Sequence, residues 1–192
     1  SSLVPFHFEK LKISGLILVE AIKFPDDRGF FAETYKRSDF AANSISEHFV
    51  QDNLAHSTMG TLRGLHYQIE PKPQGKLVSV LSGDVYDVAV DIRKGSPAFG
   101  QWYGILLRHS NHQMLYIPPG FAHGYCVISD EATFAYKVTN EYDAELERGF
   151  LWNDPAVSID WPVTSPKLSA RDTQMPLLSE AENNFHYKSS VP

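Results

Sequence analysis

The chain is divided into short runs of β-branched and aromatic residues, which turn residues interrupt at spacings of about 8–14 positions. The clearest case lies between residues 76 and 90, where two such runs flank the turn Ser82-Gly83-Asp84. Runs of this kind around a Gly-Asp turn predict a β-hairpin. About seven or more such runs, with few helical patterns, predict an all-β jelly-roll sandwich or barrel that can hold a ligand inside.

Other segments give weaker predictions. Strands are expected over 16–22, 30–35 and 49–57, and a further strand pair over 124–128 and 132–138, around the turn at 129–131. Along 49–57, Gln51 and Asn53 alternate with their neighbours and should share a face, with Ser57 as a weaker candidate. Short helices are expected near 38–42, which begins with a capping serine, and near 168–172. The polar tail after about residue 178 is expected to be peripheral.

Length and composition limit the classes of protein. A chain of 192 residues favours a single domain over residues 1–192. The net charge of −6 argues against a nucleic-acid partner. A single cysteine, Cys126, rules out an intrachain disulfide. No apolar run has the length of a membrane span and no signal-peptide pattern opens the chain, so we expect a cytoplasmic protein with no membrane partner.

Two segments carry the histidines of greatest interest. His66 lies in the run 62–68 beside Arg63 and Gln68, and His123 follows the tight turn of 116–120. On a regular strand, Arg63 and His66 would face opposite sides, whereas His66 and Gln68 would share a face. A closed β container would be needed to bring the two histidines together.

Three interpretations of these histidines compete. Each can be a hydrogen-bonded core residue. A cupin-type metal site is disfavoured, because Tyr67 and Gln68 stand where further ligands would be needed. Acid–base chemistry fits better, because imidazole can accept a proton near neutral pH. Candidate partners are Asp172 or Asp87 as the orienting carboxylate, Lys76 beside an anion, and Tyr136 or Tyr142 as a phenolic acid.

Several motifs together resemble the dTDP-4-dehydrorhamnose 3,5-epimerase family of nucleotide-sugar epimerases. The most specific are LRGLHYQ at 62–68 and IPPGFAHG at 117–124. The matching motifs extend over about residues 5 to 176 and follow one another in the same order as in the family. The further matching stretches are 27–33, 51–53, 75–78, 87–93, 96–97, 99–100, 136–137, 152–155 and 168–169 with Asp172.

The resemblance implies a cupin-like jelly roll that forms a homodimer by exchange of N-terminal strands and uses neither a metal nor another cofactor. It implies that His66 is the catalytic base and that Asp172 completes its dyad. Tyr136 would be the acid on the opposite face of the sugar, and Lys76 would stabilise the enolate oxygen.

The resemblance also implies binding residues. Arg63, His123, Gln51 and Asn53 would hold the sugar and the diphosphate. Tyr142 matches another tyrosine of the pocket. Three residues of the 27–33 motif would reach the nucleotide, from the partner subunit: Arg28, Phe31 and Glu33.

The implied substrate is dTDP-4-dehydro-6-deoxy-α-D-glucose, which a double epimerase converts to dTDP-4-dehydro-β-L-rhamnose. A relative that inverts only C3 or only C5 is the first alternative. A non-catalytic cupin that binds a nucleotide sugar is the second alternative, disfavoured because binding alone needs no opposed acid and base. A metal-dependent cupin oxygenase or isomerase is the third.

Overall fold

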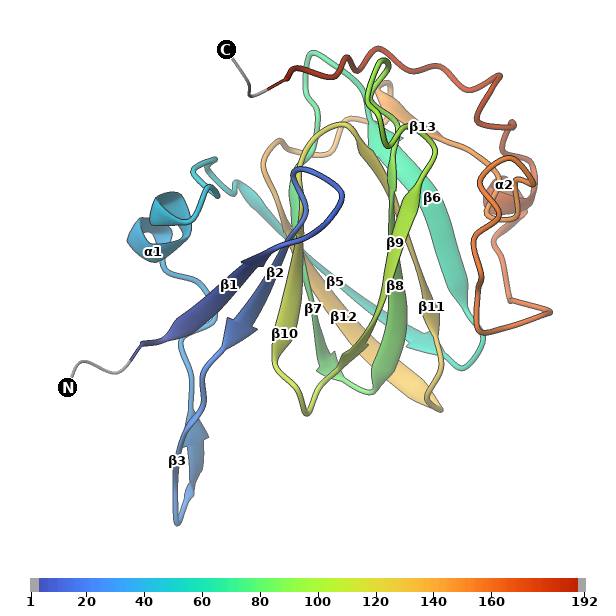
Figure 1. The fold of residues 1–192 in the computed structure, drawn as a ribbon. Coiled ribbons are helices and arrows are strands. Elements are labelled where there is room, and N and C mark those ends of the chain that lie inside the picture. The colour runs from blue at the N-terminus through green and yellow to red at the C-terminus, as the bar shows by residue number, and fades with distance from the viewer. Residues whose placement is uncertain (1–3, 190–192) are drawn as a thin grey trace.

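The computed structural model describes residues 4–189 and consists mainly of two antiparallel sheets that face each other (Figure 1). The six-stranded sheet contains, in spatial order, β1 (Phe6–Lys10), β2 (Ile17–Ala21), β10 (Gln113–Ile117), β7 (Lys76–Ser82), β12 (Glu131–Val138) and β5 (Gln51–Thr58). The five-stranded sheet contains β13 (Glu147–Gly149), β6 (Leu62–Gln68), β11 (Phe121–Val127), β8 (Asp84–Asp91) and β9 (Trp102–Arg108). The predicted all-β, jelly-roll class is confirmed.

Alternation along the strands builds the core between the sheets. Val78 and Phe134 point inward from the six-stranded sheet and meet Ala89 and Leu107 from the five-stranded sheet. All four side chains are almost fully buried. Burial of a Val, Leu or Phe side chain stabilises the fold by about 1.5–3 kcal/mol. The other, outward-facing set of β7 side chains includes Leu81, which is 60% exposed.

The predicted hairpin at Ser82-Gly83-Asp84 is wrong. β7 pairs with β10 and β12, whereas β8 pairs with β9 and β11, so the turn carries the chain from one sheet to the other. The predicted pair 124–128 and 132–138 is wrong for the same reason, because β11 and β12 belong to different sheets. A turn motif reverses the chain locally, but the partner of each strand depends on distant residues.

The N-terminal half differs from the prediction in two places. β4 (Gly29–Phe31) pairs only with β3 (Phe24–Asp26) and ends well before Tyr35, so the expected strand 30–35 is too long. The helix α1 (Arg37–Ala42) is present, but Lys36 occupies its N-cap without a side-chain hydrogen bond, so the serine cap is wrong. The β3–β4 hairpin extends away from the body of the molecule (Figure 1).

The C-terminal tail packs on the molecule through Tyr187, whose backbone N–H donates to the Lys94 carbonyl. Leu178 and Phe185 are buried against the outer face of the five-stranded sheet, and Tyr67 donates a hydrogen bond to the Glu182 carbonyl at 2.6 Å. The expectation of a peripheral tail is therefore wrong, because its few apolar residues fill that outer core. The predicted helix near 168–172 is confirmed as α2 (Ala170–Thr173), with Ser169 as its N-cap.

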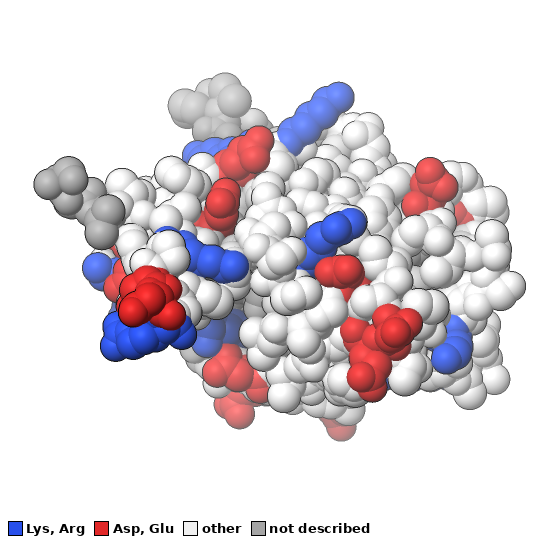
Figure 2. Space-filling model, turned by 90° about the horizontal axis from the view of Figure 1, so that it is seen from below, with Lys and Arg blue, Asp and Glu red and all other residues white. Residues whose placement is uncertain are grey.

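The lower face of the molecule carries acidic and basic side chains scattered among uncharged ones (Figure 2). Within residues 4–189, no helix is long and apolar enough to cross a membrane.

Candidate active site

A cavity of about 370 Å³ opens between the two sheets. Strands of both sheets contribute to its wall, which is rich in groups that can exchange protons or hydrogen bonds. Its lining residues are Gln51, Asn53, Leu54, His66, Tyr67, Gln68, Gln74, Lys76, Tyr136, Tyr142 and Glu147. Six of the residues singled out from the sequence thus meet at one site.

His66 lies on the wall of this cavity and contacts a buried carboxylate. Its Nε2 lies 2.6 Å from Oδ1 of Asp172, which is 3% exposed. The backbone N–H of Gly64 donates to the other carboxylate oxygen at 3.1 Å, and the Ser169 hydroxyl caps the short helix at the Asp172 N–H. Burial opposes ionisation of Asp172, but the contacts with His66 and the Gly64 N–H outweigh it and lower the pKa of this carboxyl.

Arg63 and His66 line a common second cavity of about 350 Å³, which corrects the expectation that they face opposite sides. The strand is not regular between them. Gly64 has a φ of +140°, and the pairing of β6 with β11 shifts register beside it. A Cβ at Gly64 would lie 2.7 Å from Cα of Gly124, so only glycine allows this close approach.

Lys76 and Tyr136 form the opposite wall of the first cavity. Burial lowers the pKa of Lys76 to about 8, although Asp87 and Glu147 act in the other direction. The Lys76 ammonium lies 5.7 Å from the centroid of the Tyr136 ring. Burial also raises the pKa of Tyr136, so this phenol stays protonated at neutral pH.

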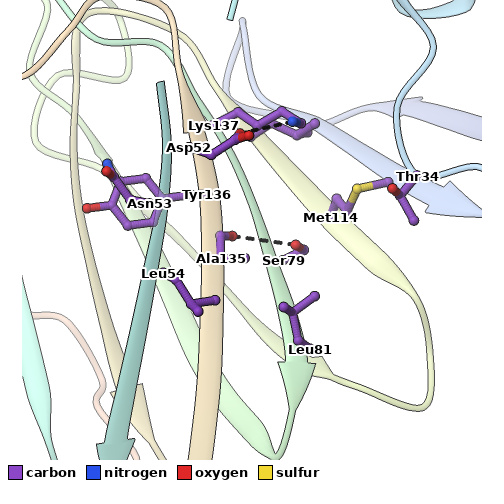
Figure 3. Close-up of a pocket in the computed structure, with 11 residues that line it drawn as sticks. Thr34, Asp52, Asn53, Leu54, Ser79, Leu81, Met114, Ala135, Tyr136 and Lys137 are labelled. Atoms are coloured by element: carbon purple, nitrogen blue, oxygen red, sulfur yellow. Dashed lines mark hydrogen bonds and ion pairs between the residues drawn. The ribbon is translucent and has the colours of Figure 1, made fainter. Parts of the chain in front are cut away.

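Asn53 and Gln51, on β5, line the cavity beside Tyr136. The Tyr136 ring and the Asn53 side chain lie on one side of β12, whereas Ser79, Leu81 and Met114 lie on the other (Figure 3). The Gln51 amide donates to Asn53 at 2.8 Å, and its oxygen accepts the backbone N–H of Tyr142 at 2.9 Å.

Glu147 and Arg171 belong to the site but were missed in the sequence. The Tyr142 hydroxyl donates to Glu147 at 2.5 Å, and the Arg171 guanidinium lies 3.1 Å from the same oxygen. A strand of three residues is too short to show an alternating pattern, so Glu147 gave no signal. The only hint of Arg171 is its place directly before Asp172.

His123 is buried and is absent from the lining of both cavities. It is 5% exposed and its Nε2 lies 2.6 Å from Oδ1 of Asp87, which is fully buried. Burial lowers the pKa of His123 and raises that of Asp87. Asp87, the other candidate partner of His66, therefore orients His123, and both side chains are buried.

The remaining predicted binding residues lie outside the cavity. Arg28 and Phe31 belong to the β3–β4 hairpin, and Glu33 follows it. Phe31 is 67% exposed, and Arg28 forms an ion pair with Asp26 at the hairpin tip, at 2.6 Å. Within a single chain they contribute nothing to the lining of the cavity.

Metal ligands are not grouped in the part of the chain that the structure describes. No set of three or more His, Cys, Asp or Glu side chains there is arranged to hold a metal ion. Whether the chemistry needs a metal stays a prediction from the sequence. The cavity does combine an oriented imidazole, a buried ammonium and a protonated phenol. These are the groups that proton abstraction beside a carbonyl requires.

Comparison with known proteins gives a consistent result. Residues 10–180 match the family model of dTDP-4-dehydrorhamnose 3,5-epimerase. A dTDP-4-dehydrorhamnose 3,5-epimerase of Shigella flexneri is 52% identical over 164 residues, which cover 85% of this chain and 91% of that protein. A crystal structure of dTDP-6-deoxy-D-glucose-3,5-epimerase from Legionella pneumophila, in complex with dTDP-4-keto-L-rhamnose, is 43% identical with a TM-score of 0.92, and the match covers 96% of this chain and 100% of that chain. A dTDP-4-dehydrorhamnose 3-epimerase of Streptomyces niveus is 39% identical over 174 residues, 90% of this chain and 84% of that protein.

Proposed function

This chain belongs to the dTDP-4-dehydrorhamnose 3,5-epimerase family, and on that premise we propose that His66 is the base and Tyr136 the acid of its reaction. The enzyme is an isomerase that converts dTDP-4-dehydro-6-deoxy-α-D-glucose to dTDP-4-dehydro-β-L-rhamnose. The observation that supports the two roles is that an imidazole oriented by Asp172 and a half-buried phenol line one cavity from different sheets.

The proposed steps follow from the acidity of the hydrogens beside a ketone. Because Asp172 occupies Nε2 of His66, the other ring nitrogen accepts the proton from C3 or C5. The electron pair of the broken C–H bond moves onto the C4 oxygen, where the Lys76 ammonium stabilises the enolate. One preorganised donor of this kind contributes about 3–4 kcal/mol. Tyr136 then donates its proton to the carbon from the opposite face, which inverts the centre.

We propose that the diphosphate binds beside the dyad. Arg63, Lys167 and Arg171 line the second cavity next to His66, and forked guanidinium groups suit phosphate oxygens. Gln51 and Asn53, on the first cavity, are proposed to hold the sugar. His123 is buried on β11 opposite His66 of β6. Its proposed contribution to substrate binding is indirect, because it is absent from the lining of both cavities.

We propose a homodimer in which the hairpin of one copy reaches the pocket of the other. Two apolar surfaces support this: Phe30 and Phe31 of the hairpin are 56% and 67% exposed, and Leu54 and Leu81 on the outer face of the six-stranded sheet are 68% and 60% exposed. The outer face also borders a cavity of about 340 Å³ (Figure 3). Contact between copies would remove both surfaces from water, and would offer Phe31 for stacking on thymine.

Light scattering after size exclusion tests the dimer. Leu81→Asp is expected to convert a dimer into a monomer, whereas Phe99→Asp, at an exposed aromatic residue elsewhere, should stay dimeric. A monomeric wild type, or a dimeric Leu81→Asp variant, would contradict this interface.

The alternative is an epimerase that inverts one carbon, because a 3-epimerase is among the similar proteins. Proton NMR of dTDP-4-dehydro-6-deoxyglucose with the enzyme in D₂O separates the two. Deuterium at both C3 and C5 indicates double epimerisation, and deuterium at one carbon indicates the alternative. Binding of the nucleotide sugar without exchange at either carbon would reject both and leave a binding protein.

A further inference from the structure

The strand β13, at the edge of the five-stranded sheet, is held by few backbone hydrogen bonds. Within residues 4–189 its strand partner is β6 alone, and Gly149 lies opposite His66, the proposed base. Just beyond this pair, the Phe150 N–H donates to the Leu65 carbonyl at 3.1 Å. A short edge segment of this kind opens more readily than the centre of a sheet. The strand that carries the base therefore gains from support outside the sheet.

This support comes from the C-terminal segment 182–187, here called the strap, which runs past β13 (Figure 1). Tyr67 and Arg148 lie opposite each other on β6 and β13, and Glu182 contacts both. The Tyr67 hydroxyl donates to the Glu182 carbonyl at 2.6 Å, and Nε of Arg148 donates to the Glu182 carboxylate at 2.7 Å. Burial raises the pKa of Tyr67 to about 12, so its hydroxyl keeps the proton that it donates. One residue of the strap thus bridges the cross-strand pair next to His66.

The strap is fixed to the rest of the molecule at further points. The buried Asn183 side chain donates to the Ile92 carbonyl. Asn184 exchanges two hydrogen bonds with the backbone of Glu70, at 3.1 and 3.2 Å. Phe185 is 6% exposed and packs in the outer core of the five-stranded sheet. These anchors fix the backbone on the C-terminal side of Glu182.

We propose that Glu182 is a positioning residue, which clamps β13 onto β6 from the outer face and thereby holds His66 in the geometry that proton abstraction needs. The inference rests on the proposed function of the site. Glu182 is absent from the lining of both cavities, so it acts through Tyr67 and Arg148. An exposed ion pair alone contributes little, and the Glu182 side chain is 60% exposed. Here the anchored strap has already lost its backbone freedom, so the clamp needs little further ordering.

Glu182→Ala tests the proposal, because it removes the carboxylate. Exchange of substrate hydrogens in D₂O is followed against substrate concentration, at a temperature where circular dichroism shows folded protein. We expect kcat to fall about 3- to 10-fold through a small displacement of His66, with little change in KM. Glu182→Gln keeps an oxygen that accepts from Arg148, so it should recover most of the loss. Glu180→Ala, at an exposed acid two positions earlier, is the matched control and should behave as wild type.

A double-mutant cycle tests whether Glu182 acts through Arg148. Arg148→Met should lower kcat to a similar extent, and the addition of Glu182→Ala should then lower it no further. A double variant whose loss equals the product of the two single losses would contradict this route.

Backbone amide exchange tests the clamp without reference to the reaction. Deuterium uptake by the segment 144–150, measured by mass spectrometry, should be faster in Glu182→Ala than in wild type and in Glu180→Ala. Equal uptake in the three proteins would show that Glu182 does not hold β13.

The outcomes separate this inference from the proposed function. Absence of substrate exchange in the wild type would reject the proposed function, whereas amide uptake would still test the clamp. With an active wild type, an unchanged kcat in Glu182→Ala would overturn the inference, even if the melting temperature fell. A raised KM at unchanged kcat would overturn it too. If Glu182→Ala did not fold, Arg148→Met would decide, and an unchanged kcat there would overturn the positioning role.

Discussion

His66 and Asp172 lie 106 positions apart in the chain, yet Nε2 of the imidazole is 2.6 Å from Oδ1 of the carboxylate. The Gly64 N–H and the Ser169 cap hold Asp172 in place. Because one carboxylate oxygen is held by Gly64 and the backbone by Ser169, the other oxygen fixes the orientation of the imidazole ring and leaves Nδ1 to accept a proton. The expected behaviour of variants follows from this arrangement.

His66→Ala removes the proposed base. Exchange of the C3 and C5 hydrogens should fall by about 10²–10⁴-fold, the usual contribution of a general base. Affinity for dTDP, measured by calorimetry, should change little because Arg63, Lys167 and Arg171 of the second cavity remain in place. His109→Ala, in an exposed turn, serves as the control. Wild-type turnover in His66→Ala would remove His66 from the role of base.

Tyr136→Phe removes the phenolic proton and leaves the ring. Abstraction by His66 does not need that proton, so washout of the substrate hydrogens should slow less than formation of the inverted product. Both rates are read from the same NMR time course. An equal loss of washout and turnover would contradict the assignment of Tyr136 as the acid.

The lowered pKa of Lys76 predicts that activity declines at alkaline pH. Burial lowers the pKa of Lys76 to about 8, so the ammonium is present below that pH and is lost as the pH rises through it. The rate of enolisation should therefore decline above about pH 8. In Lys76→Met this decline should vanish and the rate should fall about 10²–10³-fold. Lys12→Met is the exposed control, and a wild-type rate that is flat to pH 10 would exclude a charged Lys76 from the chemistry.

Asp87→Ala tests whether the second His–Asp pair is structural. The variant leaves the buried His123 without its partner, and breaking a buried pair costs about 3–5 kcal/mol of unfolding free energy. Urea unfolding followed by tryptophan fluorescence measures the loss. Asp87→Asn keeps a hydrogen-bonding group and should lose less, and Asp130→Ala, at the surface, should lose almost nothing. Equal stability of Asp87→Ala and wild type would refute this role.

Residue alternation in the sequence correctly predicted which side chains share a face of a strand when one face of that strand is buried. The alternation of Gln51 and Asn53 along β5 is confirmed, because a strand with one face toward the core has no other register. The predicted pairing of β7 with β8 failed because a turn at Gly83 fits a crossing between sheets as well as a hairpin. Strand partners depend on contacts far apart in the sequence, which no local window contains.

The residues around His66 show the same limit. A regular strand would separate Arg63 from His66, but the glycine between them breaks the regularity and brings both to one cavity. Glu147 lies on a strand too short for any period to be visible. Tail residues such as Phe185 read as peripheral because a single aromatic residue in a polar segment does not reveal the surface that it covers.

The close approach of Gly64 to Gly124 also bears on how the motif RGLH should be interpreted in other sequences. Its glycine satisfies a steric demand of the backbone, whereas its histidine supplies the proposed chemistry, so the two letters are under separate constraints. A chain that lost the reaction while keeping the fold would retain the glycine, and another residue could replace the histidine. The glycine therefore indicates the fold. The histidine, together with a distant aspartate, is what indicates the proposed reaction.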